Sequence, residues 1–227
     1  MKGIIGSVAL MLFLVGCGNG GEKVVETTDF SHAARLLTQV KTTQFFTDEK
    51  IGEDDIKKIL DSGINAPSAM NTQPWYFTAV TDEDTNLQLK NSMAKMRPPK
   101  SPDLPPKGLD ENFSKGKAEF SKAPNKAGMG DAPLTIVISC KEGSDFSAAL
   151  AVQNMSVEAQ LLGYGTKIMT APTMALNTDE YKALLNIPEG YNVVGVLLVG
   201  KASAEEVHAL SGATTRRDFS DLVTIID

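Results

Sequence analysis

Cysteine and histidine are scarce in this chain of 227 residues, which contains two of each. Two cysteines are too few for a multi-cysteine metal site. The histidines, His32 and His208, lie outside every motif described below, so the sequence does not support a Ser-His-Asp hydrolase. No paired-glycine phosphate motif lies between a predicted strand and a predicted helix, as it does in Rossmann and P-loop proteins. The chain is therefore not predicted to be a metalloenzyme, a hydrolase or a nucleotide-binding protein of these types.

An excess of positive charge is also lacking. Lysine and arginine number 22 against 28 acidic residues, which gives a formal net charge of −6 at pH 7. The sequence pI is near 5.0, and no stripe of clustered basic residues is present. Because nucleic-acid binding depends on basic patches that neutralise phosphates, we do not expect a nucleic-acid partner.

No apolar run is long enough to span a bilayer as a mature helix, but residues 1–16 are typical of an export signal. Lys2 precedes an apolar stretch, and Leu-Val-Gly-Cys at 14–17 resembles a bacterial lipobox. Cleavage there would leave Cys17 for lipid attachment, with residues 17–29 as a flexible tether. The predicted location is the bacterial cell envelope, on the extracytoplasmic side of a membrane. A plain secretory signal with an incidental cysteine is the alternative.

Residues 30–227 have the length of one domain with a sizeable core. Apolar periodicity predicts helices at 31–41, 54–63 and 145–162, and strands at 75–81, 134–140, 193–199 and 222–226. This mixture indicates an α and β fold. Residues 97–108 contain five prolines, which exclude helix and sheet interiors. We expect an exposed loop there, serving as a lid, as an arm towards a partner subunit or as a spacer.

The predicted helix at 145–162 has little polar face. A helix that is apolar nearly all round must be buried on all sides. It is either a central core helix or a helix covered jointly by its own sheet and a second subunit.

The segment Ala-Pro-Ser-Ala-Met-Asn-Thr-Gln-Pro-Trp at 66–75 joins a predicted helix to a predicted strand. Pro67 and Pro74 fix their own φ and disfavour helix in the preceding residues. The polar side chains of Ser68, Asn71 and Gln73 could then contact the edge of a planar heterocycle. An ordinary helix-to-strand connection, with Ser and Asn as turn formers, explains the same residues.

This loop and several other segments, in the same order along the chain, resemble the nitroreductase family. The further matches are Phe-Thr-Asp at 46–48, Asp-Ala-Pro at 131–133, Gln-Asn-Met at 153–155, Leu-Gly-Tyr-Gly-Thr at 162–166, Ile-Pro-Glu-Gly-Tyr at 187–191 and Arg216. Family members bind FMN as homodimers. The resemblance implies an α+β, nitroreductase-like fold with a central mixed, mostly antiparallel sheet flanked by helices, assembled as an intertwined homodimer.

The resemblance also implies which residues bind FMN: Lys41, Thr42, Gln44, Pro67, Ser68, Asn71, Thr170, Ala171 and Arg216. Arg216 would bind the phosphate, for which its neighbour Arg217 could substitute. Backbone amides of the segment from Gly163 to Ala171 would approach the flavin N5 and O4 atoms. A helix C-cap accounts for Gly163 equally well. No residue in this set resembles a general acid or base, so no catalytic side chain is predicted.

The chain departs from the family at 40–44, where members usually carry Arg-x-Ser-x-Arg/Lys. Val40 and Gln44 replace both cations, and Lys41 is a candidate replacement. The departure predicts weaker FMN binding and a lower flavin potential than in relatives.

The implied function is FMN-dependent hydride transfer, by a ping-pong mechanism, from a reduced donor such as NAD(P)H to nitroaromatics, quinones or activated alkenes. The alternative is a lipid-anchored dimeric binding protein with a degenerate flavin site.

Overall fold

A computed structural model describes residues 34, 36, 37, 42–95, 128–204 and 218–226 of the chain. Ala34, Leu36 and Leu37 are helical, as predicted, and the rest of the predicted helix at 31–41 lies outside the described residues. The predicted signal, tether and proline-rich loop also lie outside them, together with Cys17, Lys41 and Arg216.

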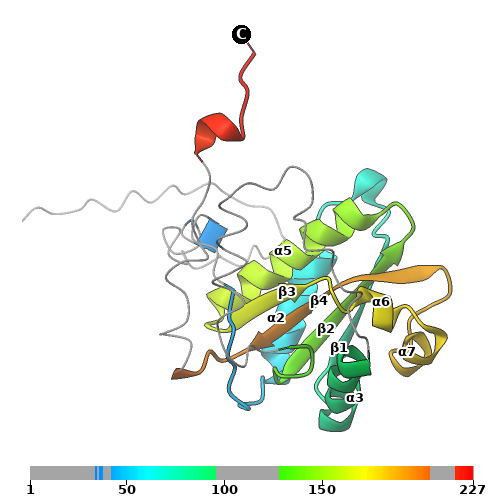
Figure 1. The fold of residues 1–227 in the computed structure, drawn as a ribbon. Coiled ribbons are helices and arrows are strands. Elements are labelled where there is room, and N and C mark those ends of the chain that lie inside the picture. Colours follow the sequence, from blue (N-terminus) through cyan, green and yellow to red (C-terminus); the bar gives the residue numbers. More distant parts are fainter. Residues whose placement is uncertain (1–33, 35, 38–41, 96–127, 205–217, 227) are drawn as a thin grey trace, which may run out of the picture. The chain divides into compact units, whose positions relative to one another are not determined.

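The described residues form a four-stranded antiparallel sheet, shown in Figure 1. Its strands are β1 (Trp75–Val80), β2 (Leu134–Lys141), β3 (Gly165–Met169) and β4 (Tyr191–Gly200). They lie in the order β1-β2-β4-β3, so β1 and β3 form the two edges. The predictions of β1, β2 and β4 are confirmed, whereas β3 was not expected as a strand.

Helices cover both faces of the sheet. Helices α2 (Glu53–Ile64) and α5 (Asp145–Leu161), both predicted, share one hydrophobic core with Ile136 and Ile138 of β2. Helices α3 (Glu83–Lys95), α6 (Thr173–Leu176) and α7 (Asp179–Leu184), which were not predicted, contribute to a second core that contains Val137. Successive strand residues point to opposite faces, so the buried apolar residues of β2 contribute to both cores. This arrangement confirms the α+β class.

Helix α5 is buried along one side only in the single chain. Ala148, Ala151 and Met155 are fully buried, as expected from its apolar sequence. By contrast, the Phe146 ring is 80% exposed, and Leu161 is also exposed. The prediction that α5 is covered all round is therefore not fulfilled within one copy of the chain.

The predicted strand at 222–226 is wrong for the described chain. A short 3₁₀ helix spans Phe219–Asp221, and none of the described strands includes the residues that follow it. Leu222 and Ile226 are 60% and 91% exposed. Strand geometry needs a neighbouring strand to satisfy its backbone groups, and no described strand pairs with this segment.

Candidate functional site

The predicted site residues that the structure describes fall into two groups. Pro67, Ser68 and Asn71 lie in the loop between α2 and β1. Thr42 and Gln44 belong to a segment that lies against β3, where the Thr43 amide donates to the Thr166 carbonyl at 2.8 Å. Thr170 and Ala171 directly follow β3.

The sheet keeps the two groups apart within one chain. The first group precedes Trp75, which pairs with Cys140 at one end of the sheet. In the second group, Thr42 and Gln44 lie beside Thr166, which pairs with Val199, and Val199 pairs with Leu134 at the other end. Thr170 and Ala171 follow Met169 at the end of the edge strand β3. Strands β1 and β3 are also three strand spacings apart, which amounts to about 14 Å. One copy of the chain therefore does not bring all the predicted site residues together.

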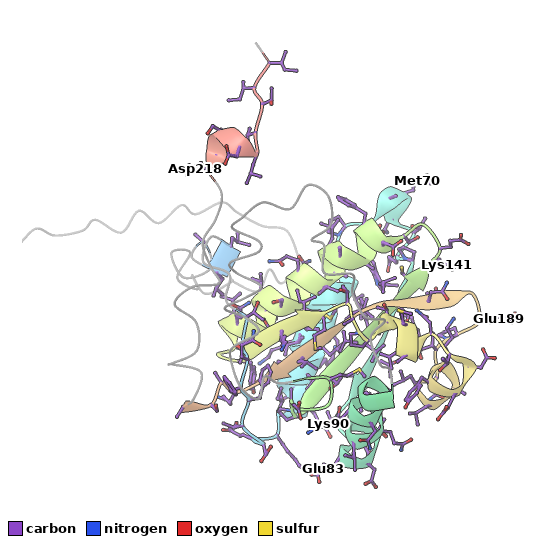
Figure 2. All side chains as sticks on the ribbon, in the orientation of Figure 1. Met70, Glu83, Lys90, Lys141, Glu189 and Asp218 are labelled. Atoms are coloured by element: carbon purple, nitrogen blue, oxygen red, sulfur yellow. The ribbon has the colours of Figure 1, made fainter. Side chains whose placement is uncertain are left out.

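The loop of the first group has a constrained backbone. Met70, Asn71 and Gln73 have φ values of 51°, 53° and 45°, a left-handed region that non-glycine residues seldom occupy. The Gln73 amide donates to the Ser68 hydroxyl at 3.0 Å, and the Gln73 side-chain amide donates to Asn71 Oδ1 at 3.3 Å. Figure 2 shows Met70 at the tip of this loop, and the residue is 94% exposed. Backbone strain that persists in an exposed polar loop favours a binding role.

The second group contains a buried ion that sequence reasoning missed. Lys167 in β3 is 8% exposed, and its ammonium group donates to Gln44 Oε1 at 3.0 Å. Gln44 itself is only 2% exposed. The structure thus places a cation beside the residue at which the sequence predicted that positive charge had been lost. A lysine in the middle of the otherwise uncharged segment at 165–169 was the signal that could have found it.

The alternation of β3 explains why Lys167 lies there. Thr166 faces α5, where its hydroxyl lies 2.9 Å from that of Ser156, and Gln160 Nε2 donates to the Ser156 hydroxyl at 3.2 Å. Lys167 therefore points to the opposite face of the sheet, as does its cross-strand partner Leu198.

Gly165 allows the segment at 42–44 to approach β3. A methyl group at this position would lie 2.3 Å from Thr43 Oγ1. By contrast, Gly163 ends α5, with φ of +86° and its amide donating to the Gln160 carbonyl. The helix C-cap interpretation of Gly163 is therefore confirmed.

A cluster around Tyr164 lies between α2 and the start of β3. The Tyr164 hydroxyl donates to Asp55 Oδ2 at 2.9 Å, and the Lys201 ammonium lies 5.2 Å from the ring centroid. Hydrogen bonds from Lys58 and Tyr164 hold the pKa of Asp55 below its usual value. Burial, and then the Asp55 carboxylate, raise the pKa of Tyr164.

The other described features do not suggest a reactive centre. Cys140 is buried, and burial, with a smaller contribution from the Asp145 charge, raises the pKa of its thiol to about 11. This thiol is therefore a poor nucleophile. Within the described ranges there is no group of acidic, histidine or cysteine side chains that could hold a metal ion, and no helix long and apolar enough to span a membrane.

An open cavity of about 550 Å³ lies between the start of α3 and the residues that precede β2. Its wall includes Asp48, Asn86, Lys90 and Asp131. None of the predicted site residues lines it, so it was not found by sequence reasoning.

Comparisons with known proteins agree with this architecture. The model of the nitroreductase family matches residues 37–201. A predicted NADH dehydrogenase/NAD(P)H nitroreductase of Archaeoglobus fulgidus is 25% identical over 76% of this chain and 86% of its own length. A CLA biosynthesis enone reductase from Lactiplantibacillus plantarum is 33% identical, over 28% of this chain and 30% of its own length.

Solved structures show the same fold. A nitroreductase of Bacteroides fragilis with bound FMN has a TM-score of 0.61 and 21% identity, over 86% of this chain and 98% of its own. An FMN- and NADPH-dependent nitroreductase of a Sphingopyxis strain has a TM-score of 0.65 and 18% identity, over 86% and 99%. With the family match over most of the domain, these likenesses establish that the chain belongs to the nitroreductase family.

Proposed function

We propose that this protein is an FMN-dependent oxidoreductase that passes hydride from a reduced donor, such as NAD(P)H, to an electron-poor acceptor by a ping-pong mechanism. Nitroaromatics, quinones and activated alkenes are the acceptor classes. Membership of the family supports the proposal, as does the bound FMN of similar structures. The observation on this chain that carries it is the exposed loop at 68–73, which holds polar groups on a strained backbone.

The described residues fit FMN by their chemistry. A flavin needs directed hydrogen bonds around its ring and positive charge or amides near its anionic groups. The loop offers the exposed side chain of Asn71, the segment beside β3 offers the exposed Thr42, and β3 itself offers the buried Lys167. Arg216, outside the described residues, is proposed for the phosphate. When bound, FMN supplies hydride acceptance and donation.

A second copy of the chain completes the proposed site. One copy separates the Ser68 loop from the Gln44 segment by the width of the sheet, so a single ring cannot contact both. A homodimer could bring the loop of one copy to the β3 edge of the other. The uncovered side of α5 includes the exposed apolar side chains of Phe146 and Leu161, which such an interface would bury.

The side chains then bind and orient rather than transfer protons. Ser68 fixes the loop by accepting the Gln73 amide, which leaves Asn71 exposed for a ligand. Thr170 stabilises the turn after β3, because its carbonyl accepts the Thr173 amide at 3.1 Å. Dimer closure would exclude water from the ring. The raised pKa of Cys140 agrees with chemistry that needs no protein nucleophile.

The direct test is to extract the full chain in mild detergent, record its visible spectrum and measure its mass by light scattering. We expect a yellow dimer with about one FMN per chain, whose flavin is bleached by NAD(P)H and re-oxidised by a nitroaromatic or quinone. A yellow dimer bleached only by another reductant would keep the flavin assignment and reject NAD(P)H as donor.

The second candidate function is a dimeric binding protein with a degenerate flavin site. The replacement of both family cations at Val40 and Gln44 favours it. A colourless dimer that does not bind added FMN would select this alternative.

We further propose that Cys17 carries a lipid that anchors the protein in the cell envelope, facing away from the cytoplasm. The support is the lipobox-like tetrapeptide at 14–17. NAD(P)H is scarce outside the cytoplasm, so a quinol or another reduced partner could then act as donor. Mass spectrometry of the mature N-terminus tests the anchor, and an unmodified Cys17, or cleavage elsewhere, would reject it.

A further inference from the structure

Lys167 is an unusual residue for a short edge strand. Its side chain is 8% exposed, although an ammonium group is strongly solvated in water and costly to bury. Its hydrogen bond at 3.0 Å to Gln44 Oε1 joins residues 123 positions apart. Gln44 is also buried, so both ends of this contact are fixed by the surrounding packing.

The backbone around the pair is built for close approach. The Thr43 amide donates to Thr166 at 2.8 Å, directly before Gln44 and Lys167 in their respective segments. Gly165 leaves the space that Thr43 occupies. Lys167 also lies three residues before Thr170, in the strand that leads to the predicted cofactor-binding turn. The ammonium group is thus held among residues of the second group of the candidate site.

We propose that Lys167 supplies, from β3, the positive charge that Gln44 lacks, and that this charge stabilises negative charge on the ring of bound FMN. The inference rests on the proposed flavin function. It assigns a cofactor-positioning role to a residue that the resemblance did not include. Lys41 is then not required as the replacement cation, and the low flavin potential expected from Gln44 alone is offset.

The charge would act selectively on the reduced cofactor. A cation close to the ring stabilises the state with more negative charge, so it raises the reduction potential. A cation that served only the phosphate would bind oxidised and reduced FMN equally, because the phosphate charge is the same in both. The midpoint potential therefore distinguishes the ring from the phosphate as the group that Lys167 serves.

The experiment compares the full-length wild-type protein with Lys167→Met, which removes the charge, and Lys167→Arg, which keeps it. FMN affinity is measured by quenching of flavin fluorescence, and the midpoint potential of the bound flavin by reductive titration. Lys57→Met is the matched control, since Lys57 lies on α2 with a side chain that is 71% exposed. Thermal unfolding without FMN separates a folding defect from a loss of binding.

We expect the Lys167→Met change to lower the affinity for reduced FMN at least about tenfold more than it lowers the affinity for oxidised FMN. This factor is that of losing a charge-assisted hydrogen bond. For a two-electron couple, this factor corresponds to a midpoint about 30 mV more negative. Lys167→Arg and Lys57→Met should keep the wild-type midpoint. The exchange variant Gln44→Lys with Lys167→Gln should restore most of the potential, because the charge returns from the neighbouring position.

Two results would overturn the inference while leaving the proposed function intact. The first is a Lys167→Met protein with unchanged FMN affinity and an unchanged midpoint, and the second is an equal loss of affinity for both redox states, which also leaves the midpoint unchanged. If Lys167→Met does not fold, the exchange variant (Gln44→Lys with Lys167→Gln) serves as the test. An exchange variant that folds like the wild type but keeps a lowered flavin midpoint would reject the assignment. A wild-type protein that binds no FMN at all would overturn the proposed function and this inference together.

Discussion

Gly165→Ala is the sharpest test of how the candidate site is assembled. The added methyl group would lie 2.3 Å from Thr43 Oγ1 and 2.9 Å from both Thr43 Cβ and Cγ2. These distances are shorter than van der Waals contact, so an atom must move. Thr43 is buried and its amide is bonded to Thr166, so the segment that carries Gln44 has to shift away from β3. The substitution should therefore affect stability and cofactor binding together.

The expected magnitude follows from this overlap. Overpacking a buried site costs about 1–3 kcal/mol of unfolding free energy. In a protein of this size each kcal/mol lowers the melting temperature by roughly 2–4 °C, which gives a total fall of about 2–12 °C. FMN affinity should also fall, because the hydrogen bond between Lys167 and Gln44 depends on the same approach.

The assay is thermal unfolding of the wild type, Gly165→Ala, Thr43→Gly and the double variant. Thr43→Gly removes all three overlapping atoms, so the double variant should recover about 1 kcal/mol or more relative to the sum of the single changes. Gly52→Ala is the control, since a methyl group there has no neighbour within 4 Å. A Gly165→Ala protein with wild-type melting temperature and FMN affinity would refute the described packing of 42–44 against β3.

The remaining predictions concern three separate features. Tyr164→Phe should raise the lowered pKa of Asp55 towards 3.8 in an NMR titration, because it removes a hydrogen bond to the carboxylate, and an unchanged pKa would contradict that bond. The stability linked to the lowered pKa of Asp55 is present above pH 3.8 and is lost as the pH falls below it. Cys140 should react with a thiol reagent only after denaturant is added, because it is buried and its pKa is about 11, and fast labelling of this residue in the native protein would contradict its burial. Met70→Gly should leave the free energy of unfolding in urea unchanged or raise it by up to about 1 kcal/mol, since it relieves a left-handed φ of 51° at an exposed position. A clear loss of stability would show that the Met70 side chain has a packing role.

Most long elements of the fold could be predicted from the sequence, but the 13-residue helix α3 was missed, because polar residues dominate it. Helix α2 has apolar residues at helical spacing, and α5 has little polar face. The runs that became β2 and β4 are too apolar to lie outside a core. The short elements could not be predicted in the same way. Helices α6 and α7 contain four and six residues, fewer than a periodic signal requires. Strand β3 has five residues with a lysine in the middle, which weakens the apolar alternation of a strand.

The sequence also placed the polar loop at 66–75 correctly between α2 and β1, because its prolines and turn residues act locally. It could not show that Met70, Asn71 and Gln73 have positive φ, since non-glycine residues seldom adopt that region. Nor could it assign Gly165, whose need for a hydrogen side chain comes from Thr43, distant in the chain.

The residues by themselves determined the family, the main helices and strands and the polar composition of the candidate site, because these depend on local propensity and on motif order. Only the tertiary structure decided that Lys167 is buried beside Gln44, and that the Ser68 loop and the β3 edge lie at separate positions on one sheet. The physical reason is that strand order and register determine which distant side chains meet. The lost charge at Gln44 is a property of one position, whereas its replacement by Lys167 arises from the pairing of two segments.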